Sequence, residues 1–299
     1  MTVGVKPRTV SANGVEIAYE TFGAAEDRPL LLVMGLGTQM LAWHDDFCAD
    51  LAARGFRVVR FDNRDCGLST HLHAAGAPDL ETLLADPRSV ATYTVEDMAD
   101  DAAGLLEALG IPAAHVVGAS MGGMIAQALA AGHPDKVRSL TSIMSTPSPA
   151  IGAPTPEAMA ALLAPPPTTR AEAVERAVLT YRVIGSPGFP LEEPWLRDVA
   201  ARAFDRSFDP AGVVRQLAAI QASGDRTEAL RAIAVPTLVV HGDADPLVQP
   251  DGGRATAAAI PGAELIVIPG MGHNLPREIW PDLVARIVKT ADAGDARSG

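Results

Sequence analysis

A serine lies between two glycines at the point where an apolar run meets an apolar helical pattern. The stretch Gly118-Ala119-Ser120-Met121-Gly122 fits the pattern G-x-S-x-G and directly follows Val116-Val117. Between a strand and a helix this pattern makes a sharp turn that exposes a serine nucleophile, and its glycines avoid collisions with both elements. A glycine-rich turn can also bind phosphate, and Ser120 can be a small turn residue without chemistry. The stretch alone leaves these three interpretations open.

The residues around the turn argue against phosphate binding. A phosphate loop of the form G-x-x-x-x-G-K-[ST] requires a lysine, and after Ser120 no lysine occurs before Lys136. The dinucleotide-binding pattern G-x-G-x-x-G is also absent from this stretch. We therefore predict that Ser120 is a nucleophile.

A serine nucleophile needs a general base, which a histidine supplies when a carboxylate holds it in one tautomer. His273 lies in the loop that follows the last predicted strand. Asp245 lies at the tip of the turn after the preceding strand, with room for one helix and one strand before His273. The neighbouring Asp243 is predicted only to shape that turn. The predicted catalytic residues are therefore Ser120, Asp245 and His273.

The other histidines are less suitable as the base. His115 begins a strand, His133 follows a helix at the opposite end, His241 ends a strand, and His44, His71 and His73 fall in early loops. His71-Leu72-His73 is the only close histidine pair, and it has no nearby carboxylate at the spacing of metal ligands. It therefore predicts an exposed loop, and we expect neither a metal nor a cofactor.

The negative oxygen that develops during acyl transfer needs preorganised N–H donors. The backbone N–H of Met121 directly follows the nucleophile, at a helix N-terminus whose dipole favours negative charge. The second donor should come from the loop after the strand at residues 30–35, and we assign it to Leu36. The predicted oxyanion hole is thus formed by Leu36 and Met121, whereas the substrate-binding residues stay unknown.

The composition indicates a folded protein with a large core. The chain has 299 residues, of which 48% are hydrophobic, and a formal net charge of −12. This length suits one large α/β domain or two small ones. The acidic balance argues against nucleic acid or an anionic membrane as a partner and predicts a solvated acidic surface. The acid pairs Asp45-Asp46 and Asp100-Asp101 are assigned to such solvated helical faces.

The cysteines and the N-terminus bear on the cellular compartment. Cys48 and Cys66 are too few for a disulfide framework or a four-cysteine zinc site, so both are predicted to be reduced. The first residues contain no apolar signal-peptide core, and no apolar run approaches the length of a membrane span. The expected protein is cytoplasmic and acts on a small molecule, and homo-oligomer formation is left open.

Strand and helix patterns alternate along most of the chain. Asn13-Gly14 predicts a hairpin between two strands, and a strand buried on both faces is predicted at residues 30–35. Further strands are predicted at residues 57–62, 115–119, 137–145, 235–243 and 263–270. Helices are predicted at residues 41–54, 94–109, 121–131 and 277–290, followed by a mobile tail from Ala291. This alternation predicts an α/β fold whose mostly parallel sheet carries helices on both faces and antiparallel strands at one edge. Ligands of such sheets bind beyond the carboxyl ends of the strands.

The alternation stops between about residues 146 and 227. This segment is rich in proline and alanine and predicts only helices and loops, which we expect to fold over one end of the sheet as a lid. The predicted domains are therefore a core of residues 1–145 and 228–299 and a helical lid of residues 146–227. The apolar residues of the lid either favour an apolar substrate group or form the core of the lid itself: Leu162, Leu163, Val183, Ile184, Phe189, Trp195 and Phe204.

Four separated motifs give the chain a resemblance to the α/β-hydrolase superfamily over nearly its whole length. They are VMGLGTQMLAW, FDNRDCGLST, GASMGGM and the pair HGDADPLV and GMGH. The order Ser, Asp, His along the chain is also the order of this superfamily. The resemblance implies an eight-stranded, mostly parallel sheet with a helical lid insertion and a catalytic triad.

Within this superfamily the chain looks most like bacterial esterases similar to aclacinomycin methylesterase, which remove a methyl ester from a polyketide. The usual His-Gly before the oxyanion loop is Met34-Gly35 here, and Asp65 replaces a glycine of the usual D-x-R-G-x-G-x-S. Both variants occur in that group. By this resemblance Asp62 and Arg64 brace the loop beside the active site and have no catalytic role.

The prediction is a serine hydrolase that cleaves a carboxylic ester of an apolar small molecule through an acyl-enzyme. The same residues could instead cleave a C–C bond, a thioester or a lactone, or support perhydrolysis. A ligand-binding protein could also use this scaffold without catalysis, since one fold hosts many functions.

Overall fold

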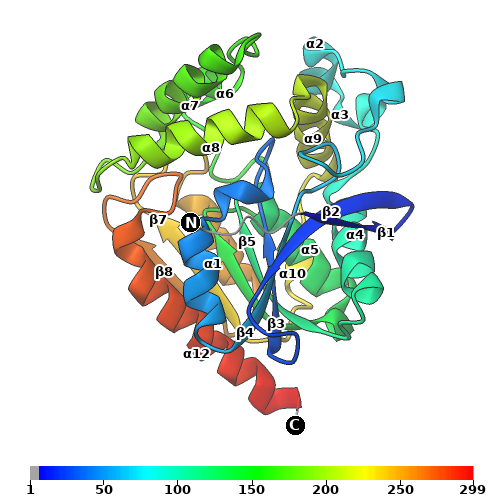
Figure 1. Ribbon diagram of the computed structural model, residues 1–299, viewed down its shortest axis with the longest axis vertical. Coiled ribbons are helices and arrows are strands. Elements are labelled where there is room, and N and C mark those ends of the chain that lie inside the picture. The colour runs from blue at the N-terminus through cyan, green and yellow to red at the C-terminus, as the bar shows by residue number, and fades with distance from the viewer. Residues whose placement is uncertain (1–6, 299) are drawn as a thin grey trace.

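The computed structural model describes residues 7–298, which contain one eight-stranded sheet (Figure 1). The order across the sheet is β1-β2-β4-β3-β5-β6-β7-β8. Antiparallel pairing joins β1 to β2 and β2 to β4, and every other neighbouring pair is parallel. The mostly parallel sheet with an antiparallel edge is therefore confirmed. The strands are β1 (Arg8–Ala12), β2 (Val15–Phe22), β3 (Arg28–Val33), β4 (Phe56–Phe61), β5 (Ala114–Ala119), β6 (Val137–Ile143), β7 (Thr237–Gly242) and β8 (Glu264–Ile268).

Helices cover both faces of the sheet, as predicted. One face packs against α1 (Asp45–Ala52) and α12 (Trp280–Ser298), and the other against α4 (Val95–Ala108), α5 (Met121–Gly132) and α11 (Asp251–Ala259). Shorter helices are α2 (Leu80–Ala85), α3 (Pro87–Val90) and α10 (Thr227–Leu230), and 3-10 turns occupy Met40–Ala42, His73–Ala75, Pro134–Lys136 and Arg277–Ile279.

The continuous apolar run in β3 follows from this sandwich of layers. Side chains along a strand point alternately to its two faces, so a strand that is covered on both sides needs apolar residues at every position. Leu31 and Val33 pack into the cluster under α4 and α5, and Leu30 and Leu32 pack into the cluster under α1 and α12. All four are fully buried.

Local signals set the ends of several elements. Asn13 and Gly14 both have positive φ, 48° and 78°, as the predicted two-residue hairpin requires. The side chain of Thr94 accepts the N–H of Asp97, and the carboxylate of Asp97 accepts the N–H of Thr94. This capping box begins α4 where the sequence predicts a helix to start.

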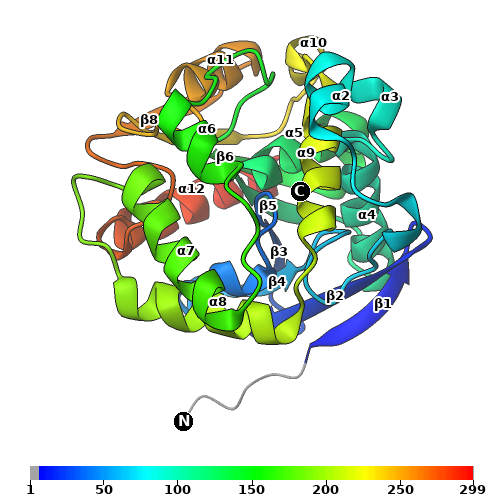
Figure 2. The ribbon, with the colours of Figure 1, turned by 90° about the horizontal axis from the view of Figure 1, so that it is seen from above.

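A helical insertion follows β6, and Figure 1 shows its helices above the strands. It contains α6 (Pro156–Leu162), α7 (Arg170–Ile184), α8 (Glu193–Arg206) and α9 (Pro210–Ser223). In the view from above, α7 and α8 lie side by side (Figure 2). Val178, Leu196 and Val199 form a small apolar cluster between them that also includes Leu41 of the core. The insertion therefore packs on itself and on the loop after β3.

The C-terminal helix differs from its prediction. α12 runs to Ser298, so the expectation of a helix that ends at residue 290 and a mobile tail from Ala291 is wrong. Ala291 is fully buried, and Arg28 at the start of β3 forms ion pairs with Asp292 and Asp295 at 2.6 and 3.2 Å. These partners are more than 260 residues away in sequence, which explains why the local pattern did not reveal the extension.

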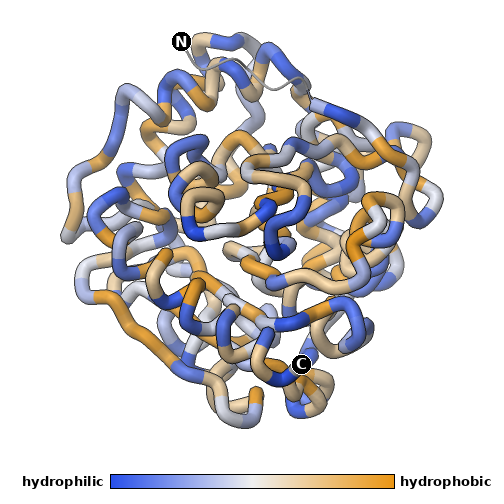
Figure 3. Tube along the Cα trace, turned by 60° about the horizontal axis from the view of Figure 1, so that its bottom comes forward, coloured by the Kyte–Doolittle hydropathy of each residue, from blue (hydrophilic) through white to orange (hydrophobic). Residues whose placement is uncertain are grey.

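Hydrophilic and hydrophobic residues alternate along the helices, as the hydropathy colouring in Figure 3 shows. This pattern is that of helices with one face on a core and one in water. Among the helices of residues 7–298, none has the length and apolar content needed to cross a membrane.

Candidate active site

The turn between β5 and α5 holds Ser120 in a backbone conformation that few residues other than glycine adopt. Its φ is 58° and its ψ is −123°. A Cβ on Gly118 would collide with the carbonyl group of Gly122, and a Cβ on Gly122 would collide with that of Val33. The two glycines therefore allow the close strand–helix approach that projects the hydroxyl of Ser120 beyond the end of the sheet.

Three side chains from separate loops form a hydrogen-bonded chain. Oγ of Ser120 lies 2.9 Å from Nε2 of His273, and Nδ1 of His273 lies 2.7 Å from Oδ2 of Asp245. Because a carboxylate only accepts, Nδ1 carries the ring proton and Nε2 is free to accept the O–H of Ser120. The three residues follow β5, β7 and β8, whose parallel carboxyl ends meet at one edge of the sheet. The structure thus brings together the three residues predicted from the sequence.

The carboxylate of Asp245 is buried and held by further hydrogen bonds. Its Oδ1 accepts the backbone N–H groups of Leu247 and Val248 at 2.9 and 3.0 Å. Nε2 of His241 lies 3.7 Å from Oδ2 but donates to the carbonyl of Val248 at 2.7 Å. Burial lowers the pKa of His241, which keeps this second ring neutral. Asp245 therefore directs its free oxygen toward His273.

The loop that carries His273 is held by the helical insertion, a relationship that sequence reasoning missed. The N–H of His273 donates to the carbonyl of Ile184 at 2.7 Å, and the N–H of Gly188 donates to the carbonyl of Gly270 at 2.9 Å. Oγ of Ser186 accepts the N–H of Gly272 at 2.9 Å. These bonds join the end of α7 to the loop after β8, more than 80 residues later.

The two predicted oxyanion donors lie at the same cavity as Ser120. Met121 begins α5, and Leu36 lies in the loop after β3; both line the cavity at Ser120. Within the described residues, neither backbone N–H donates a hydrogen bond to another group. Both N–H groups therefore stay available to a ligand, as an oxyanion hole requires.

A cavity of about 310 Å³ lies between the hydrogen-bonded chain and the insertion. Ser120 and His273 form part of its wall together with Trp43, Met124 and Trp280 from the core. The insertion contributes apolar side chains that include three of those singled out in the sequence: Leu162, Ile184 and Trp195. The cavity is thus apolar around a small polar centre, which is typical of small-molecule sites.

A second cavity of about 680 Å³ adjoins the first, and the two share Leu36, Trp195 and Leu217 in their walls. Leu163 and Phe204 line this second cavity only. The remaining two apolar residues singled out in the insertion line neither cavity: Val183 is 43% exposed, and Phe189 packs against the core. The seven residues therefore divide between cavity wall, surface and core.

Asp62 and Asp243 have structural contacts, in agreement with their predicted roles. The two oxygens of Asp62 accept the N–H groups of Met40 and Leu68, each at 2.9 Å. Oδ1 of Asp243 accepts the N–H of Gly270 at 2.6 Å. Neither carboxylate lines the cavity at Ser120.

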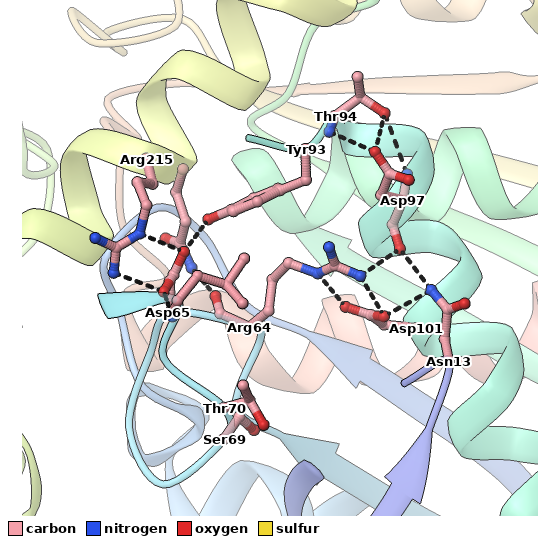
Figure 4. Close-up of polar contacts among 12 residues, drawn as sticks. Asn13, Arg64, Asp65, Ser69, Thr70, Tyr93, Thr94, Asp97, Asp101 and Arg215 are labelled. Atoms are coloured by element: carbon pink, nitrogen blue, oxygen red, sulfur yellow. Dashed lines mark hydrogen bonds and ion pairs between the residues drawn. The ribbon is translucent and has the colours of Figure 1, made fainter. Parts of the chain in front are cut away.

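Arg64 forms a buried ion pair with Asp101, drawn in Figure 4. Its Nε and Nη2 each lie 2.6 Å from one oxygen of this carboxylate, which also accepts from Asn13 at 2.9 Å. Asp101 is only 2% exposed. The prediction that Asp100-Asp101 lies on a solvated face is therefore wrong for Asp101, because Arg64 supplies a charged partner from a loop 37 residues earlier.

Asp65, the residue at a usual glycine position, has a φ of 63° and anchors the insertion. Its oxygens accept from Nε and Nη2 of Arg215 in α9 at 2.9 and 2.7 Å (Figure 4). The hydroxyl of Tyr93 donates to it at 2.8 Å, and burial raises the pKa of Tyr93 so that this proton is retained. Asp65 and Arg215 have fully buried side chains. The loop after β4 is thus joined to α9 by an ion pair shielded from water.

His44 is a cavity residue that sequence reasoning did not single out. It begins α1, and its ring lies between those of Trp195 and Trp280, 5.2 Å from each. Burial and the nearby Arg277 lower the pKa of His44. The neutral ring joins the tryptophans in the wall of the cavity at Ser120. The sequence around His44 indicated only that it lies in a loop, which does not predict a place in the cavity wall.

The histidine pair His71 and His73 also differs from its prediction. His71 is half-buried, and its Nδ1 lies 2.8 Å from Oδ2 of Asp209. The expectation that no carboxylate is near the pair is therefore wrong, because the fold brings Asp209 from 138 residues later in the chain.

Both cysteines are unpaired, as predicted. Cys48 and Cys66 are buried, and burial raises the pKa of the Cys48 thiol to about 12 and that of Cys66 well above its usual value. Burial therefore favours the protonated thiols, which are weak nucleophiles and weak metal ligands.

Comparisons with known proteins show the family of the chain. Residues 28–181 match the family described as alpha/beta hydrolase fold. The rhodomycin D methylesterase DauP of Streptomyces sp. (strain C5) is 31% identical, over 94% of this chain and 96% of that protein. The corresponding enzyme DnrP of Streptomyces peucetius is 30% identical with the same coverage. The enol-lactonase structure from Burkholderia xenovorans LB400 superposes with a TM-score of 0.73 and is 26% identical, over 95% and 99% of the two chains.

Proposed function

The chain belongs to the alpha/beta hydrolase fold family, and we propose that it is a carboxylic-ester hydrolase that works through an acyl-enzyme on Ser120. The observation that carries this proposal is the hydrogen-bonded chain from Ser120 through His273 to the buried Asp245. The three hydrogen-bonded side chains lie at an apolar cavity with two available backbone N–H groups. The homologous methylesterases support an ester as the substrate.

Acylation begins when the ester carbonyl enters the cavity beside Ser120. Nε2 of His273 takes the proton of the Ser120 hydroxyl as Oγ attacks the carbonyl carbon. Asp245 keeps the proton on Nδ1 and stabilises the imidazolium that forms. The N–H groups of Leu36 and Met121 hold the negative oxygen of the tetrahedral intermediate, and the dipole of α5 adds to their effect. His273 then protonates the departing alcohol.

Deacylation uses the same groups, with water as the nucleophile and Ser120 as the leaving group. His273 removes a proton from water, which attacks the acyl-enzyme, and the second tetrahedral intermediate again places its negative charge in the oxyanion hole. Ser120 leaves as the hydroxyl when His273 returns the proton. The cycle releases an acid and an alcohol, and it requires no metal or cofactor.

The walls of the two adjoining cavities favour an apolar substrate. Each wall is made mostly of aliphatic and aromatic side chains from the core and the insertion. We propose that residues 146–227 act as a lid over the core of residues 1–145 and 228–299, and that its inner face selects the substrate. A methyl ester of a polycyclic polyketide fits this description and agrees with the homologous methylesterases.

Labelling with a fluorophosphonate tests the nucleophile. The intact protein should gain one adduct by mass spectrometry, and Ser120→Ala should gain none. Ser89→Ala is a matched control because its hydroxyl is exposed and bonds only to the carbonyl of Asp86. An adduct that persists in Ser120→Ala would show that the assignment of the nucleophile is wrong.

Asp245→Asn tests whether the carboxylate of Asp245 orients His273 for the proposed reaction. An asparagine can leave the ring in the wrong tautomer, so kcat should fall by about four orders of magnitude while the protein stays folded. A fall smaller than about tenfold would contradict the proposed role of Asp245.

A substrate panel distinguishes the ester from its alternatives. Short p-nitrophenyl esters, aromatic polyketide methyl esters and lactones are compared by kcat/KM with the Ser120→Ala variant as background. Lactone hydrolysis is the second candidate, because an enol-lactonase is 26% identical over nearly the whole chain. Higher kcat/KM for esters supports the proposal, and activity on lactones alone contradicts it.

A further inference from the structure

A group of metal-ligand side chains lies on the rim of the second cavity, away from Ser120. His71 and His73 come from the loop after β4, and Asp209 immediately precedes α9 of the insertion. Nδ1 of His71 lies 2.8 Å from Oδ2 of Asp209, and Nδ1 of His73 lies 3.6 Å from the same oxygen. The two imidazole rings are stacked, with centroids 5.2 Å apart and planes 8° from parallel.

Both ring nitrogens of His71 face hydrogen-bond acceptors. Nε2 of His71 lies 3.0 Å from the carbonyl oxygen of Gly67 and 3.4 Å from Oγ of Ser207. A carbonyl oxygen only accepts, so Nε2 carries a proton toward Gly67. Oδ2 of Asp209 also only accepts, so without an ion Nδ1 carries a proton toward it, and a divalent cation would replace that proton between the two atoms. A backbone carbonyl that fixes the tautomer in this way is the usual outer partner of a metal-binding histidine.

The spacing of the three ligand atoms suits a tetrahedral ion. With bonds of 2.0–2.1 Å, the ligand atoms of a tetrahedral zinc ion lie about 3.3 Å apart. The two histidine–carboxylate distances, 2.8 and 3.6 Å, lie on either side of this value, and all three ligand atoms lie within 4.8 Å of one another. Rotation of His73, whose side chain is 72% exposed, would shorten the longer distance, and the shorter distance between His71 and Asp209 would lengthen when the ion enters between them.

The charges around the group are compatible with a cation. Nη2 of Arg215 lies 3.0 Å from Oδ2 of Asp209, but the same guanidinium is paired with Asp65. Two carboxylates therefore face one guanidinium, which leaves one negative charge beside the histidines. Histidine nitrogen and aspartate oxygen are both ordinary ligands of zinc in proteins.

We propose that His71, His73 and Asp209 form a binding site for a divalent transition-metal ion, with water as a fourth ligand. The ion would join the loop after β4 to the first residue before α9, and so tie the core to the insertion at the rim of the second cavity. The site is separate from the proposed hydrolysis at Ser120, which needs no metal.

Calorimetric titration with ZnCl₂ tests the site in untagged full-length protein that has been treated with a chelator. The wild type should bind one Zn²⁺ per chain, and Zn²⁺ should raise its Tm because the ion binds the folded state. His73→Ala should weaken Zn²⁺ binding at least tenfold. Removing a residue that only hydrogen-bonds to a metal ligand already lowers metal affinity about ten- to a hundredfold, and His73 is itself a proposed ligand. His73 lines neither cavity and is mostly exposed, so this variant should fold and keep its Tm in the absence of metal.

His133→Ala is the matched control. His133 also contacts a carboxylate, that of Asp100 at 2.7 Å, but has no second histidine beside it. Removing it should leave Zn²⁺ binding unchanged. The proposal is overturned if the wild type binds no Zn²⁺, if His73→Ala binds it as tightly as the wild type, or if the loss occurs in His133→Ala instead.

Discussion

The hydroxyl oxygen of Ser186 accepts the N–H of Gly272 at 2.9 Å, directly before His273. The same hydroxyl donates to Oδ1 of Asn274 at 2.6 Å, directly after it. One side chain of the helical insertion therefore holds both neighbours of the proposed general base. This contact makes the insertion part of what positions the base, in addition to covering the cavity.

Ser186→Ala should slow catalysis without unfolding the protein. Loss of both hydrogen bonds lets the His273 loop shift, and a displacement of about 1 Å in a catalytic group costs up to a hundredfold in rate. We expect kcat to fall about ten- to a hundredfold with little change in KM. The rate of fluorophosphonate labelling should fall in parallel, whereas Ser89→Ala should match the wild type. Equal kcat in both variants would remove Ser186 from the proposed positioning role.

Gly122→Ala should destabilise the protein far more than Gly132→Ala, because only Gly122 lies in the tightly packed turn at the start of α5. A Cβ on Gly122 would meet the carbonyl groups of Val33 and Met34, whereas a Cβ on Gly132 meets nothing within 4 Å. Urea unfolding should show a loss of at least about 3 kcal/mol for Gly122→Ala and a change within about 1 kcal/mol for Gly132→Ala. Similar values for the two variants would contradict the close packing of the turn.

Arg215→Met should destabilise the protein because it leaves Asp65 as a buried charge without its partner. Breaking a buried ion pair typically costs about 3–5 kcal/mol in the free energy of unfolding. Arg202→Met in α8 is the control, since Arg202 pairs with Asp198 at the surface with a side chain that is 48% exposed. An exposed pair of this kind contributes about 0–1 kcal/mol. A loss for Arg215→Met no larger than that for Arg202→Met would disprove the anchoring role of the Asp65–Arg215 pair.

The stability of the protein should fall in mild acid because His115 is buried as a neutral ring. Burial lowers its pKa from 6.5 to about 4, and the carboxylate of Asp295 only partly opposes this effect. The unfolded chain therefore binds the proton first, and stability present above pH 6.5 is lost as the pH falls toward 4. Between pH 7 and pH 5 the loss from this residue should be about 2 kcal/mol.

Urea unfolding of the wild type and His115→Gln at the two pH values checks this contribution. The glutamine of the variant does not titrate. The free energy of unfolding of the variant should therefore fall by about 2 kcal/mol less than that of the wild type between pH 7 and pH 5. Parallel losses in the two proteins would mean that other groups cause the acid sensitivity.

The order of strands and helices and the place of the proposed nucleophile could be predicted from the sequence because their signals are local. The Asn13-Gly14 turn, the apolar run of β3 and the Thr94 cap each depend on residues within a few positions of one another. The meeting of Ser120, Asp245 and His273 also follows from local patterns, since each follows a parallel strand and the carboxyl ends of such strands lie at one edge. Motifs around these strands likewise identified the family.

The tertiary structure alone decided which distant groups became partners. Asp101 with Arg64, Asp65 with Arg215, and His71 with Asp209 lie 37, 150 and 138 residues apart in the chain. No periodicity relates such positions, because their contact depends on how the insertion and the loops pack on the finished sheet. The same holds for α12, whose last turns are held by Arg28 at the other end of the chain. Local sequence signals therefore determined the helices, the strands and the positions of Ser120, Asp245 and His273. Tertiary packing determined the buried ion pairs, the cavities and the hydrogen bonds between the insertion and the His273 loop.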